Sequence, residues 1–244
     1  MILRRCRRAV ALAFALAWCI LSYWLARLRG PLTLEQRALW LQSACRHVLA
    51  SVGITYAVEG QPPTRGLVVA NHLSYLDIGV FSAIMPCCFV SKKEVLRWPF
   101  FGEAARSGAT IFLDRSSLAS ANKAAALIGE RLTHPIPMLL FPEGTSTDGS
   151  QVRRFHSRLI HPAIEAAAPV TAAAIRYLPG GNMPERELCW YGDMAFLPHL
   201  IKLLATADFS VLVRFGQPCV YADRRIAAAE THAQVATMRA EGNL

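Results

Sequence analysis

Two short polar segments of the chain hold side chains that could carry out acid–base chemistry or bind a substrate. The first spans residues 71–77 (NHLSYLD) and directly follows the apolar residues 67–70. An imidazole acts as a base near neutral pH, and a nearby carboxylate can hold its ring and stabilise the imidazolium. The spacing therefore allows a pair between His72 and Asp77, but taken alone it favours the simpler alternative, an N-capping Asp77 beside an ordinary loop histidine.

The second polar segment spans residues 141–146 (FPEGTS) and follows the apolar residues 136–140. Gly144 and Thr145 can offer a backbone N–H and a hydroxyl to a phosphate, as loops after strands often do. The carboxylate of Glu143 would repel a phosphate unless it orders a cation or a hydroxyl. This segment alone predicts either a phosphate-binding loop or an ordinary turn.

A third segment, residues 108–115, is a strand-like run that ends in Asp114-Arg115. The Arg115 guanidinium could hold a phosphate with two parallel hydrogen bonds. Pairing with the neighbouring Asp114 is the simpler alternative.

These segments belong to a pattern of short apolar runs and helix-like stretches that starts near Ile54. The apolar runs lie at residues 66–70, 110–113, 136–141, 170–175 and 211–215, and the clearest helical stretches at 117–132 and 156–168. Continuous apolar strands separated by helices predict an α/β fold, a single domain whose central, mostly parallel or mixed sheet is covered by helices. Sites in such folds are built on loops that leave the carboxyl ends of strands.

Residues 9–26 contain no charged side chain, and arginines flank them on both sides. A helix of this length rises about 27 Å, close to the thickness of about 30 Å of a hydrocarbon core. We therefore predict a membrane anchor, because a small-residue cleavage site for a signal peptide is missing before Arg27. A single span led by these arginines would export the rest of the chain, whereas a helix lying in one leaflet would keep it in the cytoplasm.

A second helix is predicted after Pro31, where Thr33 and Gln36 resemble a capping box. An apolar stripe follows on one face of this helix, between residues 34 and 49. We accordingly divide the chain into an anchor helix at 1–30, an amphipathic helix at 31–53 and an α/β domain at 54–244.

Composition narrows the classes of partner. The 244 residues are 53% hydrophobic and 18% charged with a net charge of +9, which excludes disorder and fits either a membrane surface or nucleic acid. The arginines are dispersed and the longest basic run adjoins the apolar helix, so we expect a membrane and no nucleic acid. The seven cysteines form no metal-binding spacing, and unpaired thiols fit a reducing compartment. A cytoplasmic active site on a bacterial inner membrane is therefore expected.

In this order, the segments resemble the glycerolipid acyltransferase family, which includes the lysophosphatidate (1-acylglycerol-3-phosphate) acyltransferases. Residues 71–77 are similar to its NHxxxxD block, 111–115 to its second block, which ends in arginine, and 141–145 to its FPEGT block. Residues 168–170, with a proline before a strand, look like its fourth block.

The resemblance implies roles for six residues. His72 and Asp77 would be the catalytic pair, and Arg115, Glu143, Gly144 and Thr145 would bind the glycerol-phosphate acceptor. It also implies acyl transfer from acyl-CoA or acyl-carrier protein to lysophosphatidate, giving phosphatidate for phospholipid biosynthesis, with membrane lipids as partners and without a cofactor or metal.

One departure from the family pattern keeps the acceptor open. Many relatives continue FPEGT with arginine, whereas this chain has Ser146. Lyso-ornithine lipid or a lysophospholipid with a larger headgroup is therefore an alternative acceptor. An alternative of another class is a non-catalytic peripheral protein that binds anionic lipid.

Overall fold

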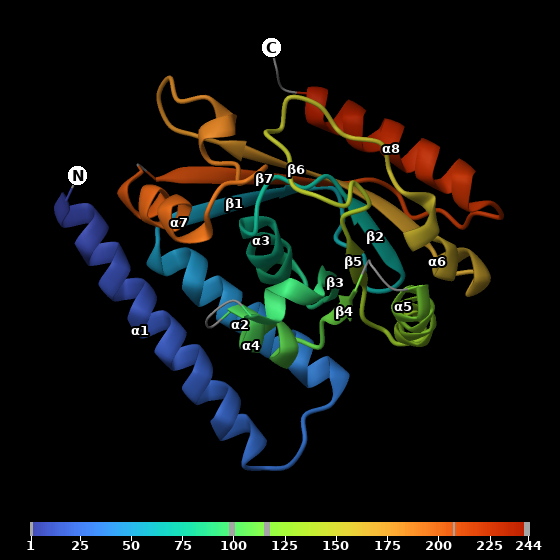
Figure 1. The fold of residues 1–244 in the computed structure, drawn as a ribbon, viewed down its shortest axis with the longest axis horizontal. Helices are drawn as coiled ribbons and strands as arrows, with labels where there is room; N and C mark the ends of the chain where they lie inside the picture. The colour runs from blue at the N-terminus through green and yellow to red at the C-terminus, as the bar shows by residue number, and fades with distance from the viewer. Residues whose placement is uncertain (1, 98–100, 115–117, 207, 242–244) are drawn as a thin grey trace.

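The computed structural model describes residues 2–97, 101–114, 118–206 and 208–241, in which seven strands form one sheet with helices on both faces (Figure 1). The strands are β1 (Ile54–Glu59), β2 (Leu67–Ala70), β3 (Cys88–Lys92), β4 (Ile111–Leu113), β5 (Met138–Leu140), β6 (Val170–Leu178) and β7 (Phe209–Phe215). The α-helices are α1 (Ile2–Arg27), α2 (Leu34–Ser51), α3 (Leu76–Ile84), α4 (Phe101–Ser107), α5 (Leu118–Leu132), α6 (His161–Glu165), α7 (Phe196–Ala205) and α8 (Arg224–Ala240). Short 3-10 turns are η1 (Lys93–Arg97), η2 (Ser157–Leu159) and η3 (Glu185–Glu187). The predicted α/β class is confirmed.

The strand order explains why the two polar segments meet. The order is β1-β7-β6-β2-β5-β3-β4, and β2 pairs in parallel with both β5 and β6. Since the carboxyl ends of parallel neighbours lie at one edge of a sheet, the loops after β2 and β5 leave side by side. The sheet is mixed because β7 runs antiparallel to β6.

Two hydrophobic cores lie on opposite faces of the sheet. Alternate side chains of a strand point to opposite faces, so in β2 Leu67 and Val69 join the core under α5, α6 and α8. Val68 and Ala70 join the core under α2, α3 and α7. All four side chains are buried, which is the burial that the continuous apolar run predicts.

Three elements differ from the sequence-based expectation. The strands β1 and β3 were not predicted, since β1 is mostly exposed and β3 follows Pro86 in a run without clear alternation. The helix expected over 156–168 is limited to η2 and the five residues of α6. It ends early because Ala167 adopts a positive φ of 46° just before Pro169.

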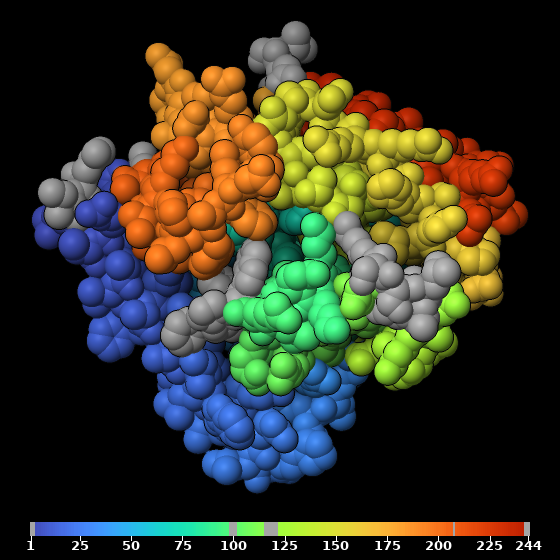
Figure 2. Space-filling model, viewed as in Figure 1, coloured from blue at the N-terminus to red at the C-terminus, as the bar shows by residue number. Residues whose placement is uncertain are grey.

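The helices α1 and α2 form a hairpin along one flank of the molecule (Figure 2). The predicted capping box at the start of α2 is present. The Gln36 backbone N–H donates to Thr33 Oγ1 at 3.2 Å, and the Thr33 N–H donates to Gln36 Oε1 at 2.9 Å. Residues 3–27 of α1 are long and apolar enough to cross a membrane, and only 11% of its most apolar window is buried.

Polar contacts hold α1 alongside the domain near both of its ends. The Arg8 guanidinium, only 4% exposed, donates to the Thr206 carbonyl and to the Asp208 carboxylate. Near the other end, the Trp40 indole N–H donates to Ser22 Oγ at 3.2 Å. The helix therefore lies against α2 and α7 and does not project away from them.

The turn before β2 gives a test of the fold. Gly66 has φ +83°, and a Cβ built on it would lie 2.3 Å from the Pro169 carbonyl oxygen. We expect Gly66→Ala to lower the free energy of unfolding by about 1–3 kcal/mol. The control is Gly129→Ala within α5, where a Cβ meets nothing within 4 Å and should stabilise by roughly 0.5–1 kcal/mol. Thermal unfolding in detergent measures both, and equal midpoints would contradict the turn geometry.

Candidate active site

The loop after β2 places His72 against Asp77. His72 Nδ1 lies 2.7 Å from Asp77 Oδ2. Asp77 stands in the first turn of α3, whose N-cap position is Tyr75, so the N-cap alternative for Asp77 is wrong. Its carboxylate instead reaches back and accepts the backbone N–H groups of Leu73 at 2.6 Å and Ser74 at 3.1 Å.

The second oxygen of Asp77 accepts a hydrogen bond from the Tyr177 hydroxyl, which comes from β6. Asp77 is fully buried, so each of these donors replaces water that the carboxylate has lost. Burial, together with the adjacent Asp77 carboxylate, raises the pKa of the Tyr177 phenol well above its ordinary value. Tyr177 therefore stays protonated and remains a donor at physiological pH.

The His72 ring is fixed from a second direction by Phe141, the residue after β5. The two rings stack with centroids 4.1 Å apart and planes 10° from parallel. The His72 side chain keeps 19% of its surface exposed. In the neutral imidazole, a proton on Nδ1 that is donated to Asp77 leaves Nε2 as a base.

Glu143 ties the two loops together through the backbone. Its Oε1 accepts the His72 N–H and its Oε2 accepts the Arg153 N–H, both at 2.8 Å. Burial raises the pKa of the Glu143 carboxyl, and the two amide donors offset this only in part. The contacts of Glu143 are thus with backbone amides, and its binding of an acceptor remains a prediction.

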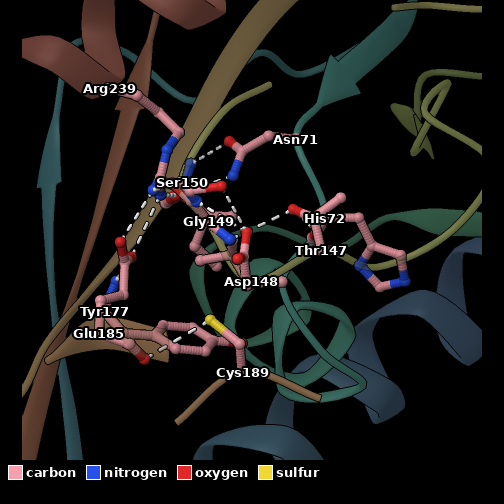
Figure 3. Close-up of polar contacts among 12 residues, drawn as sticks. Asn71, His72, Thr147, Asp148, Gly149, Ser150, Tyr177, Glu185, Cys189 and Arg239 are labelled. Carbon is pink, nitrogen blue, oxygen red and sulfur yellow. Dashed lines mark hydrogen bonds and ion pairs between the residues drawn. The ribbon is translucent and has the colours of Figure 1, made fainter. Parts of the chain in front are cut away.

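Further polar contacts fix the first loop at both ends (Figure 3). The Asn71 side-chain amide donates to the Ile175 carbonyl at 3.0 Å and accepts the Ile175 N–H at 2.9 Å. The Thr147 N–H donates to the His72 carbonyl at 2.9 Å. His72 is therefore held by β6 on one side and by the loop after β5 on the other.

Arg239, in the last turn of α8, contacts both β6 and the loop after β5 (Figure 3). It donates to the carbonyls of Gly149 and Ile175, both at 2.6 Å, and pairs with Glu185 at 2.8 Å. Glu185 in turn accepts the Tyr177 N–H at 2.7 Å. This cluster joins the loop after β5 to the strand that carries Tyr177.

The structure brings together three of the six predicted site residues, His72, Asp77 and Glu143. Gly144 has a positive φ of 78° and borders an open cleft, and Thr145 beside it is partly exposed. Arg115 lies outside the described residues. Among the described residues, no group of three or more His, Cys, Asp or Glu side chains could hold a metal ion.

Sequence reasoning missed two residues of this arrangement, Tyr177 and Arg239. Tyr177 lies 100 positions after Asp77 in an apolar strand, where a tyrosine is ordinary core. Arg239 lies in a polar helix that carries other arginines. Neither position belongs to a motif, so only the fold identifies them.

Comparison with known proteins agrees with this geometry. The family model described as Acyltransferase matches residues 54–176, from β1 into β6. The chain belongs to the acyltransferase family. The match covers the loops of His72 and Glu143, so the family resemblance predicted from the motifs is confirmed.

Curated relatives of this acyltransferase carry two kinds of name. The chain is 35% identical to the lyso-ornithine lipid O-acyltransferase of Pseudomonas aeruginosa over 77% of its own length and 71% of the relative. It is 38% identical to the enzyme of the same name from Rhodobacter capsulatus, over 67% of its own length and 60% of that relative. It is also 35% identical to the 1-acyl-sn-glycerol-3-phosphate acyltransferase of Neisseria meningitidis, over 70% of its own length and 68% of that relative.

A solved structure shares the fold of this acyltransferase. The 1-acyl-sn-glycerophosphate acyltransferase PlsC from Thermotoga maritima superposes with a TM-score of 0.69 over 98% of this chain and 95% of that one. The sequences are 16% identical, so this likeness concerns the fold, including its N-terminal helices.

Tyr177 provides a test of how the acyltransferase positions Asp77. Tyr177→Phe removes the donor to Asp77 Oδ1, so the carboxylate is held against His72 only through the donors to Oδ2. We expect the rate constant for acyl transfer to fall about tenfold or more, since a lost hydrogen bond to a buried charge costs roughly 1.5–3 kcal/mol. KM for the acceptor should change little.

Tyr56→Phe, at a partly buried position of β1, is the matched control and should leave the rate unchanged. Steady-state kinetics with a labelled acyl donor measure both variants, together with their thermal midpoints. A Tyr177→Phe enzyme with the wild-type rate would contradict the positioning role.

Proposed function

We propose that this acyltransferase moves a fatty acyl group from a thioester donor, acyl-CoA or acyl-carrier protein, to the free hydroxyl of a lysolipid. The buried, fully hydrogen-bonded Asp77 carboxylate at 2.7 Å from His72 Nδ1 is the observation that carries this proposal. It orients the ring and leaves Nε2 facing outward as a base, as a catalytic histidine–carboxylate pair requires.

The chemistry is a single displacement through a tetrahedral intermediate. His72 Nε2 removes the proton of the acceptor hydroxyl while the oxygen attacks the thioester carbonyl carbon. The C–S bond then breaks, and the imidazolium returns the proton to the leaving thiolate. Asp77 stabilises the imidazolium in between, so no covalent acyl-enzyme is needed.

Two acceptors have support, and lyso-ornithine lipid has more. Relatives with that name are 35% and 38% identical to this chain. Ser146, which is 8% exposed, also stands where many lysophosphatidate acyltransferases have an arginine, so no cation follows Thr145 there. Lysophosphatidate, the acceptor implied by the motifs, is supported by the Neisseria relative at 35% identity.

An acceptor screen on the purified full-length protein tests the reaction and ranks the acceptors. One labelled acyl donor is offered with lyso-ornithine lipid, lysophosphatidate, lysophospholipids or glycerol 3-phosphate. We expect the highest kcat/KM with lyso-ornithine lipid and measurable transfer to lysophosphatidate. His72→Ala should abolish both, because it removes the base.

Two results of the screen would contradict the proposal. Transfer by His72→Ala at a substantial fraction of the wild-type rate would exclude the His72 base. Wild-type protein that binds vesicles of anionic lipid but acylates none of the acceptors would instead support a non-catalytic lipid-binding protein.

We further propose that α1 lies in one leaflet and that the domain stays on the side of the membrane from which α1 entered. A stripe of exposed apolar side chains runs along α1, including Val10, Phe14, Trp18 and Leu25. A perpendicular crossing would carry the polar partners of α1 into hydrocarbon, because Arg8 and Asp208 are paired beside the helix.

Two exposed cysteines allow this topology to be measured. Cys6 lies at the start of α1 and Cys219 lies after β7, and both thiols are exposed. In bacterial spheroplasts, a membrane-impermeant maleimide should label neither thiol until the cells are permeabilised, and then both. Cys6→Ser and Cys219→Ser variants assign the signals. Labelling of Cys219 alone in intact spheroplasts would show that α1 spans the membrane.

A further inference from the structure

A wide cleft opens next to the loop after β5, and of the predicted site residues that the structure describes only Gly144 lines it. Its volume is about 1070 Å³, and its lining includes the apolar side chains of Leu113, Phe155, Leu159 and Ala228. Ligand sites commonly combine such an apolar lining with a few polar groups and occupy about 300–1,000 Å³. The cleft therefore has the size and character of a site for a large ligand.

Three arginines line this cleft, Arg154, Arg158 and Arg225, together with two histidines, His156 and His232. The three arginine residues are exposed, and none of the described residues that line the cleft is acidic. Arg225 has one acidic neighbour, Asp223, whose carboxylate accepts the N–H groups of Arg225 at 2.7 Å and Ile226 at 3.0 Å. The cleft thus presents a net positive charge to a ligand.

Within the described part of the chain, no ion pair involves Arg154, Arg158 or Arg225. Other arginines of the protein are paired, such as Arg214 with Glu59 and Arg239 with Glu185. The three guanidinium groups therefore have donors available for the oxygens of an anion.

The cleft adjoins the catalytic loop. Gly144 lines it, and the preceding Glu143 holds the His72 backbone. The cleft therefore borders the same loop that holds the His72 backbone. Gly144 adds no side chain to this border of the cleft.

The cleft also lies at a distance from α1, the proposed membrane-anchoring helix. Its arginines lie next to α6 and at the start of α8, on the side of the molecule opposite α1 (Figures 1 and 2). A lipid acceptor arrives from the membrane, whereas a water-soluble donor arrives from the other side. The position and charge of the cleft favour a soluble, anionic donor.

We propose that this cleft binds the phosphate groups of acyl-CoA, with the pantetheine arm running past Gly144 to place the thioester at His72. The guanidinium groups of Arg154, Arg158 and Arg225 hold the phosphates, and the apolar lining contacts the uncharged parts of the donor. This assignment rests on the proposed acyltransferase function and adds the location and chemical class of its donor.

Single and double variants of Arg158 and Arg225 to alanine test the assignment in the full-length enzyme. We expect each single variant to raise KM for acyl-CoA roughly tenfold, and the double variant to raise it further, with kcat and the acceptor KM unchanged. The control is Arg65→Ala, which removes an exposed arginine in the loop before β2. It should leave all three constants unchanged.

Three kinetic outcomes would overturn the assignment while leaving the acyltransferase function in place. Unchanged kinetics in the double variant would mean that the cleft binds no substrate. A raised acceptor KM with an unchanged donor KM would make it a site for the lipid headgroup. If the wild-type enzyme used acyl-carrier protein but not acyl-CoA, the donor would be acyl-carrier protein and the cleft would not bind CoA.

A direct measurement of CoA binding tests the proposed donor site independently of acyl transfer. Calorimetric titration of the wild-type protein with CoA should give a measurable Kd, weakened roughly tenfold or more in the Arg158→Ala/Arg225→Ala variant and unchanged in Arg65→Ala. CoA binding that is lost in the double variant supports the cleft even if no lysolipid is acylated. Equal binding by all variants overturns it.

Discussion

The arrangement of the site depends on the burial of one carboxylate, that of Asp77. A carboxylate withdrawn from water is tolerated only when donors surround both of its oxygens. The donors come from the His72 ring, two loop amides and Tyr177 of β6, which lies 100 positions later in the chain. Because these groups converge only in the folded sheet, the orientation of the histidine is a consequence of the whole domain.

A second buried carboxylate, Glu143, extends the same principle from one loop to the next. Each of its oxygens accepts a hydrogen bond from a backbone amide, one at His72 and one at Arg153 in the segment that leads to the basic cleft. The loops after β2 and β5 are therefore tied to each other, and a displacement of either would leave a buried charge with one partner fewer. Such coupling provides the preorganisation that acid–base catalysis requires.

The sequence predicted those parts of the fold and site that depend on local pattern. The strands β2 and β5 and the two polar loops could be found because apolar runs and motif residues adjoin each other in the chain. Tyr177 and Arg239 could not be found in this way. Tyr177 lies 100 positions from its partner Asp77, and Arg239 lies 90 positions from its partner Gly149. Neither residue type is unusual in its element. The short α6 depended on the backbone conformation of Ala167, which composition does not reveal.

The contacts of Arg239 with β6 and with the loop after β5 have a consequence for the order in which the site assembles. On the ribosome, α1 emerges first and can meet the membrane surface while the sheet is still incomplete. Arg239 is made after every other residue that holds the His72 loop, and β6 and the loop after β5 lack their shared anchor until then. With the proposed attachment of α1 to lipid, contact with the membrane surface thus precedes the last hydrogen bonds that hold the His72 loop.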